Sequence, residues 1–291
     1  MAGIAGALSF SGDAGSDTLN IDDTAASSDS QAVLTGTALS GLGMGLGVTN
    51  YAIDTLNIRL GDYDDLVEVQ GTSATTHIWG NGGDDVFDVS SDGASLAGTL
   101  DNVLGLLDID AGAGGNTLSV SDLGDTDADT AVLTDSALTG LAPAAINYAA
   151  TGGRFTGGIN VWAGRGSDTI QINSTRLDDV TTLYANDGDD AITVADLIGG
   201  ADRLLAIHGD GGADTLDASA VSGTNVTVLL FGDSGEDPVD DVEAEPNRRR
   251  HRSPATANLR ELGHAVILAC AQSCRGSAGD AISSAQAWTP R

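Results

Sequence analysis

The segment IWGNGGDDVFDV, from Ile78 to Val89, decides the fold that we expect, because copies of it recur along the chain. Each copy has an apolar residue, a Gly-rich turn that ends in Asp, and two apolar residues that alternate with polar ones. The clearest other copies are FSGDAGSDTLNI (Phe10–Ile21), VWAGRGSDTIQI (Val161–Ile172), LYANDGDDAITV (Leu183–Val194) and IHGDGGADTLDA (Ile207–Ala218). Such recurrence indicates a stack of similar units rather than one globular core.

Three other copies are imperfect, and a longer period lies over all of them. Tyr63 replaces a turn glycine, Asn116 replaces the Asp, and Pro238 directly follows the last Asp. AVLTGTALSGL from Ala32 returns as AVLTDSALTGL from Ala131. We therefore predict duplicated blocks over about 17–115 and 116–213, with a partial third block that ends near 240.

The spacing of the repeat suggests the shape of each unit. The recurring Asp residues are about 20 to 24 residues apart, which is enough for two short strands and two turns. We predict an all-β, right-handed parallel β-solenoid (β-roll or β-helix) over 1–240, with every Gly-Asp turn on one edge. The apolar residues after each Asp would form two inward columns. The first column is Leu19, Val67, Phe87, Leu118, Ile170, Ile192 and Leu216, and the second is Ile21, Val69, Val89, Val120, Ile172, Val194 and Ala218.

The composition favours cations as partners. The chain has 42 acidic and 12 basic residues, and 40 of its 291 residues are Gly. We expect such a chain to avoid nucleic acid and anionic membranes. No stretch is long and apolar enough to span a membrane, and the N-terminal residues do not form a secretory signal. Because the chain begins within the repeat, we expect the natural N-terminus to lie further upstream.

The Gly-Asp turns have the chemistry of a calcium site. Glycine permits the positive φ of a tight turn, which exposes backbone carbonyl oxygens. Stacked turns would also bring carboxylates of like charge together. Ca²⁺ accepts six to eight such oxygen ligands in flexible geometry. The alternative is that each Asp only closes its own turn by bonding to nearby backbone.

On these turns the sequence resembles the haemolysin-type calcium-binding (RTX) repeats, whose nonapeptide is G-G-x-G-x-D-x-U-x. GNGGDDVFD (Gly80–Asp88) and GDGGADTLD (Gly209–Asp217) carry the resemblance. It implies that turn carbonyls and the sixth-position Asp bind Ca²⁺. The residues implied are Asp17, Asp65, Gly80, Gly82, Asp85, Asp168, Asp190, Gly209, Gly211, Asp214 and Asp237. The motif occurs once per coil here, whereas the family repeats it every nine residues, so we expect one calcium edge.

These observations favour a non-catalytic function. We expect a calcium-stabilised structural or adhesive module of a secreted or cell-surface protein, with calcium ions as partners and with glycans or cell-surface molecules as further candidates. The alternative is a parallel β-helix enzyme that acts on polysaccharides, such as a lyase or an epimerase, or its carbohydrate-binding module. That chemistry usually needs a basic cluster, and the repeat region has no Lys and only scattered Arg.

Other segments carry weaker expectations. The basic tail, 241–291, has no repeat and holds both cysteines, Cys270 and Cys274, so we predict disorder or one short helix within 258–273. The run Asp125–Asp129 begins like an EF-hand loop but lacks that loop's Gly and Glu, and we interpret it as a solvated acidic loop. The histidines show no metal-binding spacing, and we expect His77 and His208 to be surface side chains.

Overall fold

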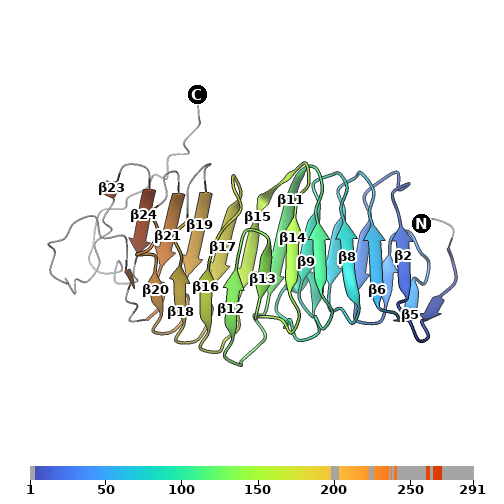
Figure 1. The fold of residues 1–291 in the computed structure, drawn as a ribbon, viewed down its shortest axis with the longest axis horizontal. Helices are drawn as coiled ribbons and strands as arrows, with labels where there is room; N and C mark the ends of the chain where they lie inside the picture. Colours follow the sequence, from blue (N-terminus) through green and yellow to red (C-terminus); the bar gives the residue numbers. More distant parts are fainter. Residues whose placement is uncertain are drawn as a thin grey trace.

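A computed structural model describes residues 4–197, 203–222, 226–235, 237 and 239–240, and the backbone of 260–262 and 265–270. This part of the chain is an elongated stack of short strands (Figure 1). Its helical content is one 3-10 turn, η1 (Gly93–Ser95). No helix in the described residues is long and apolar enough to cross a membrane.

The strands form two mostly parallel sheets. Sheet A comprises, in spatial order, β1 (Leu8–Ser11), β5 (Val48–Ala52), β4 (Leu39–Gly41), β3 (Gln31–Leu34), β7 (Leu66–Val69), β9 (Val86–Val89), β11 (Gly115–Ser121), β15 (Arg154–Trp162), β17 (Val180–Tyr184), β19 (Arg203–His208), β21 (Val226–Phe231), β24 (Ala265–Cys270) and β23 (Arg260–Leu262). Sheet B comprises β2 (Thr18–Asp22), β6 (Thr55–Arg59), β8 (Thr75–Trp79), β10 (Leu107–Asp110), β14 (Ile146–Ala149), β13 (Ala137–Thr139), β12 (Thr130–Leu133), β16 (Thr169–Ile172), β18 (Ala191–Val194), β20 (Thr215–Asp217) and β22 (Val239–Asp240). This architecture is compatible with the predicted solenoid.

The chain passes back and forth between the two sheets. From β6 to β11 and from β15 to β22, successive strands lie in alternate sheets, and each strand pairs in parallel with the next one in its own sheet. Two antiparallel meanders interrupt the alternation, β3–β5 in sheet A and β12–β14 in sheet B. They are the two copies of the AVLT segment, so the longer sequence period corresponds to a structural unit.

The inner faces of both sheets enclose one hydrophobic cluster. Val67, Phe87 and Leu118 lie side by side in sheet A, and each is fully buried. Leu56 and Leu107 are equally buried in sheet B. Side chains alternate between the two faces of a strand, so the polar residues between these positions face outward. The period-two prediction is confirmed for these strands.

The predicted inward columns are continuous only in part. Val67, Phe87 and Leu118 belong to sheet A, whereas Ile170, Ile192 and Leu216 belong to sheet B. The side chains of the two predicted columns are buried, except that Leu19 is half-buried. The columns change sheet because each duplicated block crosses between the sheets an odd number of times, so a residue and its copy lie in opposite sheets.

The helix predicted within 258–273 is wrong for 265–270. These residues form β24, which pairs in parallel with β21 and in antiparallel fashion with β23. An apolar run of this length fits a strand as well as a helix, and the last strand of a sheet offers unpaired backbone groups to the chain that follows. The remainder of 241–291 lies outside the described residues.

Phe87→Ala tests how much of the stability comes from this core. Phe87 is fully buried between Val67 and Leu118, so the substitution should lower the free energy of unfolding by about 3–5 kcal/mol through lost burial and a residual cavity. Denaturant unfolding followed by circular dichroism measures the change. Gln171→Ala, on the exposed face of β16, is the control. A loss below about 1 kcal/mol for Phe87→Ala would contradict the packing described.

Candidate metal centre

Five of the turns share a left-handed φ at two places, whereas the turns that end at Asp65 and Asp168 do not; the five end at Asp85, Asn116, Asp190, Asp214 and Asp237. In the turn that ends at Asp190, Asn186 and Gly188 have φ of 69° and 136°. In the turn that ends at Asp214, Asp210 and Gly212 have φ of 58° and 151°. Asn, Asp and Gly are the residue types that best tolerate this left-handed region. Five of the turns therefore have an equivalent backbone geometry.

Hydrogen bonds connect these aspartates from turn to turn. The backbone N–H of Asp168 donates to Oδ1 of Asp190 at 2.7 Å, and the Asp190 N–H donates to Oδ1 of Asp214 at 2.9 Å. The series starts with the Asp129 N–H, which donates to Oδ1 of Asp168 at 2.8 Å. It ends with the Asp214 N–H, which donates to Oδ1 of Asp237 at 3.0 Å. We call these five residues the C-terminal ladder.

A second series, the N-terminal ladder, comprises Asp65, Asp85 and Asn116. The Ser30 N–H donates to Oδ1 of Asp65 at 2.6 Å, the Asp65 N–H to Oδ1 of Asp85 at 2.8 Å, and the Asp85 N–H to Oδ1 of Asn116 at 2.9 Å. Tyr63, which replaces the turn glycine, therefore does not remove Asp65 from the series. Asn116 occupies the same place as the aspartates, with an amide oxygen as acceptor.

The prediction that every Gly-Asp turn lies on one edge is wrong. Turns of the N-terminal ladder lead from sheet B to sheet A, as between β8 and β9. Turns of the C-terminal ladder lead from sheet A to sheet B, as between β17 and β18. The odd number of sheet crossings per block again explains the change, so the structure has two separate ladders where the sequence predicts one.

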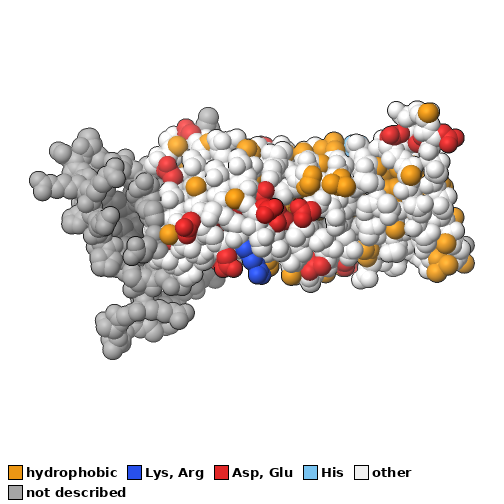
Figure 2. All heavy atoms as spheres, turned by 90° about the horizontal axis from the view of Figure 1, so that it is seen from below, with side chains coloured by type: hydrophobic (Ala, Val, Ile, Leu, Met, Phe, Trp, Pro, Cys, Tyr) orange, Lys and Arg blue, Asp and Glu red, His pale blue; other side chains and the backbone are white. Residues whose placement is uncertain are grey.

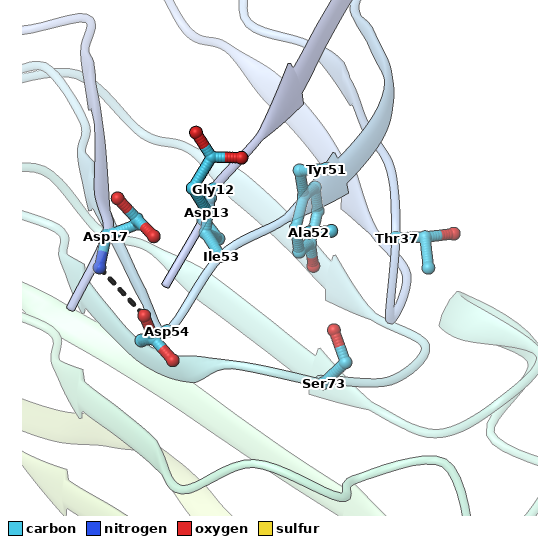
Figure 3. A pocket seen from close by; sticks show the side chains of 9 residues that line it. All are labelled: Gly12, Asp13, Asp17, Thr37, Tyr51, Ala52, Ile53, Asp54 and Ser73. Carbon is cyan, nitrogen blue, oxygen red and sulfur yellow. Dashed lines mark hydrogen bonds between the residues drawn. The ribbon is translucent and has the colours of Figure 1, made fainter. Parts of the chain in front are cut away.

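Of the remaining predicted ligands, the glycines lie in ladder turns, whereas Asp17 lies between β1 and β2 and belongs to neither ladder. Asp17 donates its backbone N–H to Oδ2 of Asp54 at 2.7 Å beside a shallow pocket that Asp13 also lines (Figure 3). Backbone bridges join Gly82 to the next turn and Gly211 to the turns on both sides. The N–H groups of Gly80 and Gly209 donate to carbonyl oxygens of Asp110 and Phe231, respectively.

The second carboxylate oxygen is the unusual feature of the ladders. In six aspartates Oδ2 has no hydrogen-bond donor and almost no contact with solvent. These residues are Asp85, Asp129, Asp168, Asp190, Asp214 and Asp237. An unpaired buried oxygen is costly, and an ionised one more so. The oxygen therefore requires a proton or a cation.

Burial and like charge raise the pKa values of the ladder carboxyls. Burial, with the charges of neighbouring aspartates, raises the pKa of Asp85 and of Asp190 to about 7. The same causes raise the pKa of Asp129 and of Asp214 to about 6. Burial also raises the pKa of Asp65, Asp168 and Asp237. Near neutral pH the carboxyls of Asp85 and Asp190 therefore stand at the boundary between the protonated form and the negative charge that a cation would neutralise.

An acidic triad adjoins the first member of the C-terminal ladder. Carboxylate oxygens of Asp122, Asp125 and Asp129 lie within 4.8 Å of one another. Asp122 is buried and accepts the Leu100 N–H at 2.7 Å. Burial and the charges of nearby aspartates raise its pKa to about 7. The triad therefore brings three carboxyl groups together, one of them buried and the other two partly exposed.

The first duplicated block provides an internal comparison for this triad. Asp23, Ala26 and Ser30 occupy the positions of Asp122, Asp125 and Asp129. The backbone N–H of Ala26 donates a hydrogen bond to the carbonyl oxygen of Asp23 at 2.8 Å, and the N–H of Asp125 donates to that of Asp122 at the same distance. In the first block, however, the Ser30 hydroxyl donates to Asp23 Oδ2 at 3.1 Å. The second block replaces this donor with a carboxylate on the same backbone.

The interpretation of Asp125–Asp129 as a solvated acidic loop is therefore wrong for Asp129, whose Oδ2 is buried and whose N–H extends the ladder. One signal in the sequence could have revealed that Asp129 belongs to the ladder. Gly124 precedes Asp129 by five residues, as Gly80 precedes Asp85, but Asp127 replaces the glycine of the turn.

Comparisons with protein-family models, curated proteins and solved structures find no match for this chain. The resemblance to RTX repeats therefore stays a prediction. The geometry of the two ladders and of the triad is independent of any relative.

Without metal, the protein should become less stable as the pH rises from about 4 to about 7. The raised pKa values mean that the folded ladders bind protons that the unfolded chain has released above its ordinary pKa of 3.8, so the stabilisation by protonation is lost over this range. Denaturant unfolding of calcium-stripped protein at about pH 5 and about pH 8 measures the difference. Equal or greater stability at about pH 8 would contradict it.

Asp190→Asn should stabilise the metal-free protein at about pH 8. Asn116 shows that an amide fits this position, since its Oδ1 accepts the N–H of the preceding turn and its Nδ2 lies 3.5 Å from the Gly112 carbonyl. Removing a buried unpaired charge should raise the free energy of unfolding by about 1–3 kcal/mol. The exposed substitution Asp101→Asn should change it by less than about 0.5 kcal/mol. A destabilised Asp190→Asn variant would show that the carboxylate is needed without metal.

Proposed function

We propose that this chain is a calcium-binding, calcium-stabilised structural module, built as a right-handed parallel β-solenoid. The observation that carries the proposal is the set of six buried Oδ2 atoms without a donor. For the handedness, the support is that crossovers between parallel strands of one sheet are almost always right-handed. For the resemblance to RTX repeats, the support is that the buried oxygens belong to the Asp of the Gly-Asp turns.

The donor chemistry of the ladders fits calcium. The turns offer carboxylate and backbone carbonyl oxygens, which are the ligands that Ca²⁺ prefers. Oδ1 of Asp168, Asp190, Asp214 and Asp237 is already engaged by a backbone N–H, so Oδ2 is the oxygen that an ion would use. A bound cation would supply the positive charge that these neighbouring carboxylates lack.

The identity of the ladder residue supports a role for the charge. Oδ1 of Asn116 accepts the backbone N–H of the preceding turn, as the aspartates do, and the neutral amide avoids the cost of a buried charge. If turn closure were the whole function, Asn would serve at every position. Aspartate instead occupies seven of the eight ladder positions. The repeated choice of the costly residue is explained by a partner that needs its negative charge.

Calcium also suits the environment that we propose, which is the cell exterior. Extracellular calcium modules bind at about 10⁻⁴–10⁻³ M, and such weak sites suffice for a protein that needs the ion for rigidity. The surface displays groups of acidic side chains (Figure 2), as expected for a chain with a net charge of −30. Glycans or cell-surface molecules are the further partners that we propose for an adhesive module. A polysaccharide lyase or epimerase is the alternative, and a screen on acidic polysaccharides distinguishes it.

Calcium should raise the melting temperature of the full chain at about pH 8 and low ionic strength. Ligand present at a hundred times its dissociation constant stabilises the folded state by about 2.7 kcal/mol per site. Circular dichroism melts with chelator and with millimolar Ca²⁺ measure the shift. The double variant Asp190→Asn/Asp214→Asn should lose much of the response, whereas Asp135→Asn/Asp196→Asn, with the same charge change at exposed positions, should keep it. A wild-type melt indifferent to calcium would overturn the proposal.

Asp129→Ser tests the triad separately. The substitution restores the arrangement of the first block, in which Ser30 donates to Asp23, so the variant should fold and should gain stability without calcium. It should bind fewer calcium ions than the wild type by isothermal titration calorimetry. Unchanged stoichiometry would remove the triad from the proposed sites and leave the ladders as the candidates.

A further inference from the structure

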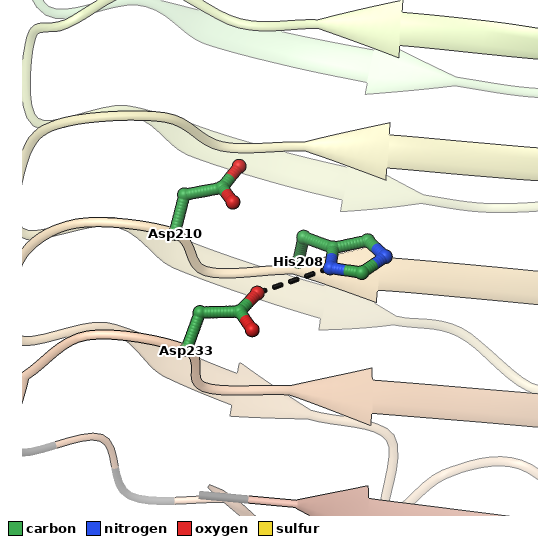
Figure 4. Close-up of side chains that lie close together, drawn as sticks. All are labelled: His208, Asp210 and Asp233. Atoms are coloured by element: carbon green, nitrogen blue, oxygen red, sulfur yellow. Dashed lines mark hydrogen bonds and ion pairs between the residues drawn. The ribbon is translucent and has the colours of Figure 1, made fainter. Parts of the chain in front are cut away.

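A second cluster of metal-ligating side chains lies at the end of β19 and in the turns that follow β19 and β21, which are the turns that end at ladder residues Asp214 and Asp237. Donor atoms of His208, Asp210 and Asp233 lie within 4.8 Å of one another, and all three side chains are partly exposed (Figure 4). Nδ1 of His208 is 3.0 Å from Oδ2 of Asp233. The cluster joins two successive turns, because Asp210 and Asp233 hold the same place in their turns.

Stacking fixes the orientation of the imidazole. The His208 ring lies between Tyr184, with ring centroids 4.9 Å apart and planes at 17°, and Phe231, at 4.5 Å and 10°. Such a sandwich limits rotation of the ring, so Nδ1 stays directed at the two turns. A ligand held in place before binding loses less freedom when the metal arrives.

The same positions in sister turns have a different chemistry. Asn81 and Asn186 occupy the place of Asp210 with the same left-handed φ, and each amide donates to a carbonyl of the preceding turn at 2.7 Å. Tyr184 occupies the place of His208 two residues before Asn186. A carboxylate cannot donate that hydrogen bond, so Asp210 and Asp233 give up the structural role of Asn. The imidazole and both carboxylates appear together at one place in the stack.

We propose that His208, Asp210 and Asp233 bind a zinc-class divalent ion through Nδ1 and one oxygen of each carboxylate. One nitrogen and two oxygens suit Zn²⁺ better than Ca²⁺, because imidazole is a ligand of zinc and calcium prefers oxygen alone. The imidazole binds as the neutral ring with its proton on Nε2. Three protein ligands at a partly exposed position leave room for water or an external group to complete the coordination.

The test is Zn²⁺ titration of the full chain in saturating Ca²⁺, which keeps calcium-dependent folding apart from the result. The Cys270→Ser/Cys274→Ser background removes the two thiols, which also bind zinc. We expect binding of Zn²⁺ by calorimetry and a shift of the His208 imidazole resonances in NMR. His208→Gln should weaken this binding at least about tenfold.

Matched variants separate metal binding from folding. His77→Gln removes the other strand histidine paired with an aspartate, since His77 Nδ1 lies 3.0 Å from Asp108, and it should leave Zn²⁺ affinity unchanged. Asp210→Asn introduces the residue found at Asn81 and Asn186, so it should fold normally and bind Zn²⁺ at least about tenfold more weakly. Wild-type affinity in His208→Gln, or no Zn²⁺ binding by a correctly folded, calcium-loaded protein, would overturn the proposal.

Discussion

One hydrogen bond, repeated from turn to turn, organises the chemistry of this molecule. The backbone N–H of each ladder Asp donates to Oδ1 of the residue at the same place in the next turn. In-register parallel pairing makes this possible, because it stacks equivalent residues directly on one another. The bond holds the accepting carboxylate in place. In six of the ladder aspartates Oδ2 is buried without a donor, whereas Oδ2 of Asp65 accepts the Gly61 N–H at 3.3 Å. The stacking brings like charges together, and burial with this repulsion raises the pKa values of the carboxyls although the hydrogen bond itself lowers them. The need for a proton or a cation follows from that burial.

The repeated backbone lets small changes of side chain create different sites. Ser30 and Asp129 occupy equivalent places, yet one donates to a carboxylate and the other adds a carboxylate. Asn186 and Asp210 have nearly the same φ, yet one donates to a carbonyl and the other joins a histidine and an aspartate. Because the scaffold supplies the geometry, a single substitution can exchange a structural hydrogen bond for a ligand. The molecule thus contains its own controls for each proposed site.

The two copies of a strand lie in opposite sheets in successive blocks, and this divides the ladder residues into two groups. Every block crosses between the sheets an odd number of times. A Gly-Asp turn that leads from sheet B to sheet A in one block therefore has a copy in the next block that leads from sheet A to sheet B. One long series of carboxylates is thereby divided into two shorter ones. Shorter series contain fewer like charges in mutual contact, which limits the electrostatic cost of the acidic turns.

The sequence alone determined the all-β class, the inward side chains such as Phe87 and Ile192, and the ladder positions Asp85, Asp190 and Asp214, because period-two alternation and turn chemistry are local properties. Only the tertiary structure decided which turns are neighbours. The division into two ladders, the burial of Asp129 and the meeting of His208 with Asp233 depend on how many times the chain crosses between sheets and on which residues the parallel register stacks. Those are long-range properties, and contacts across 25 residues leave no fixed spacing in the sequence.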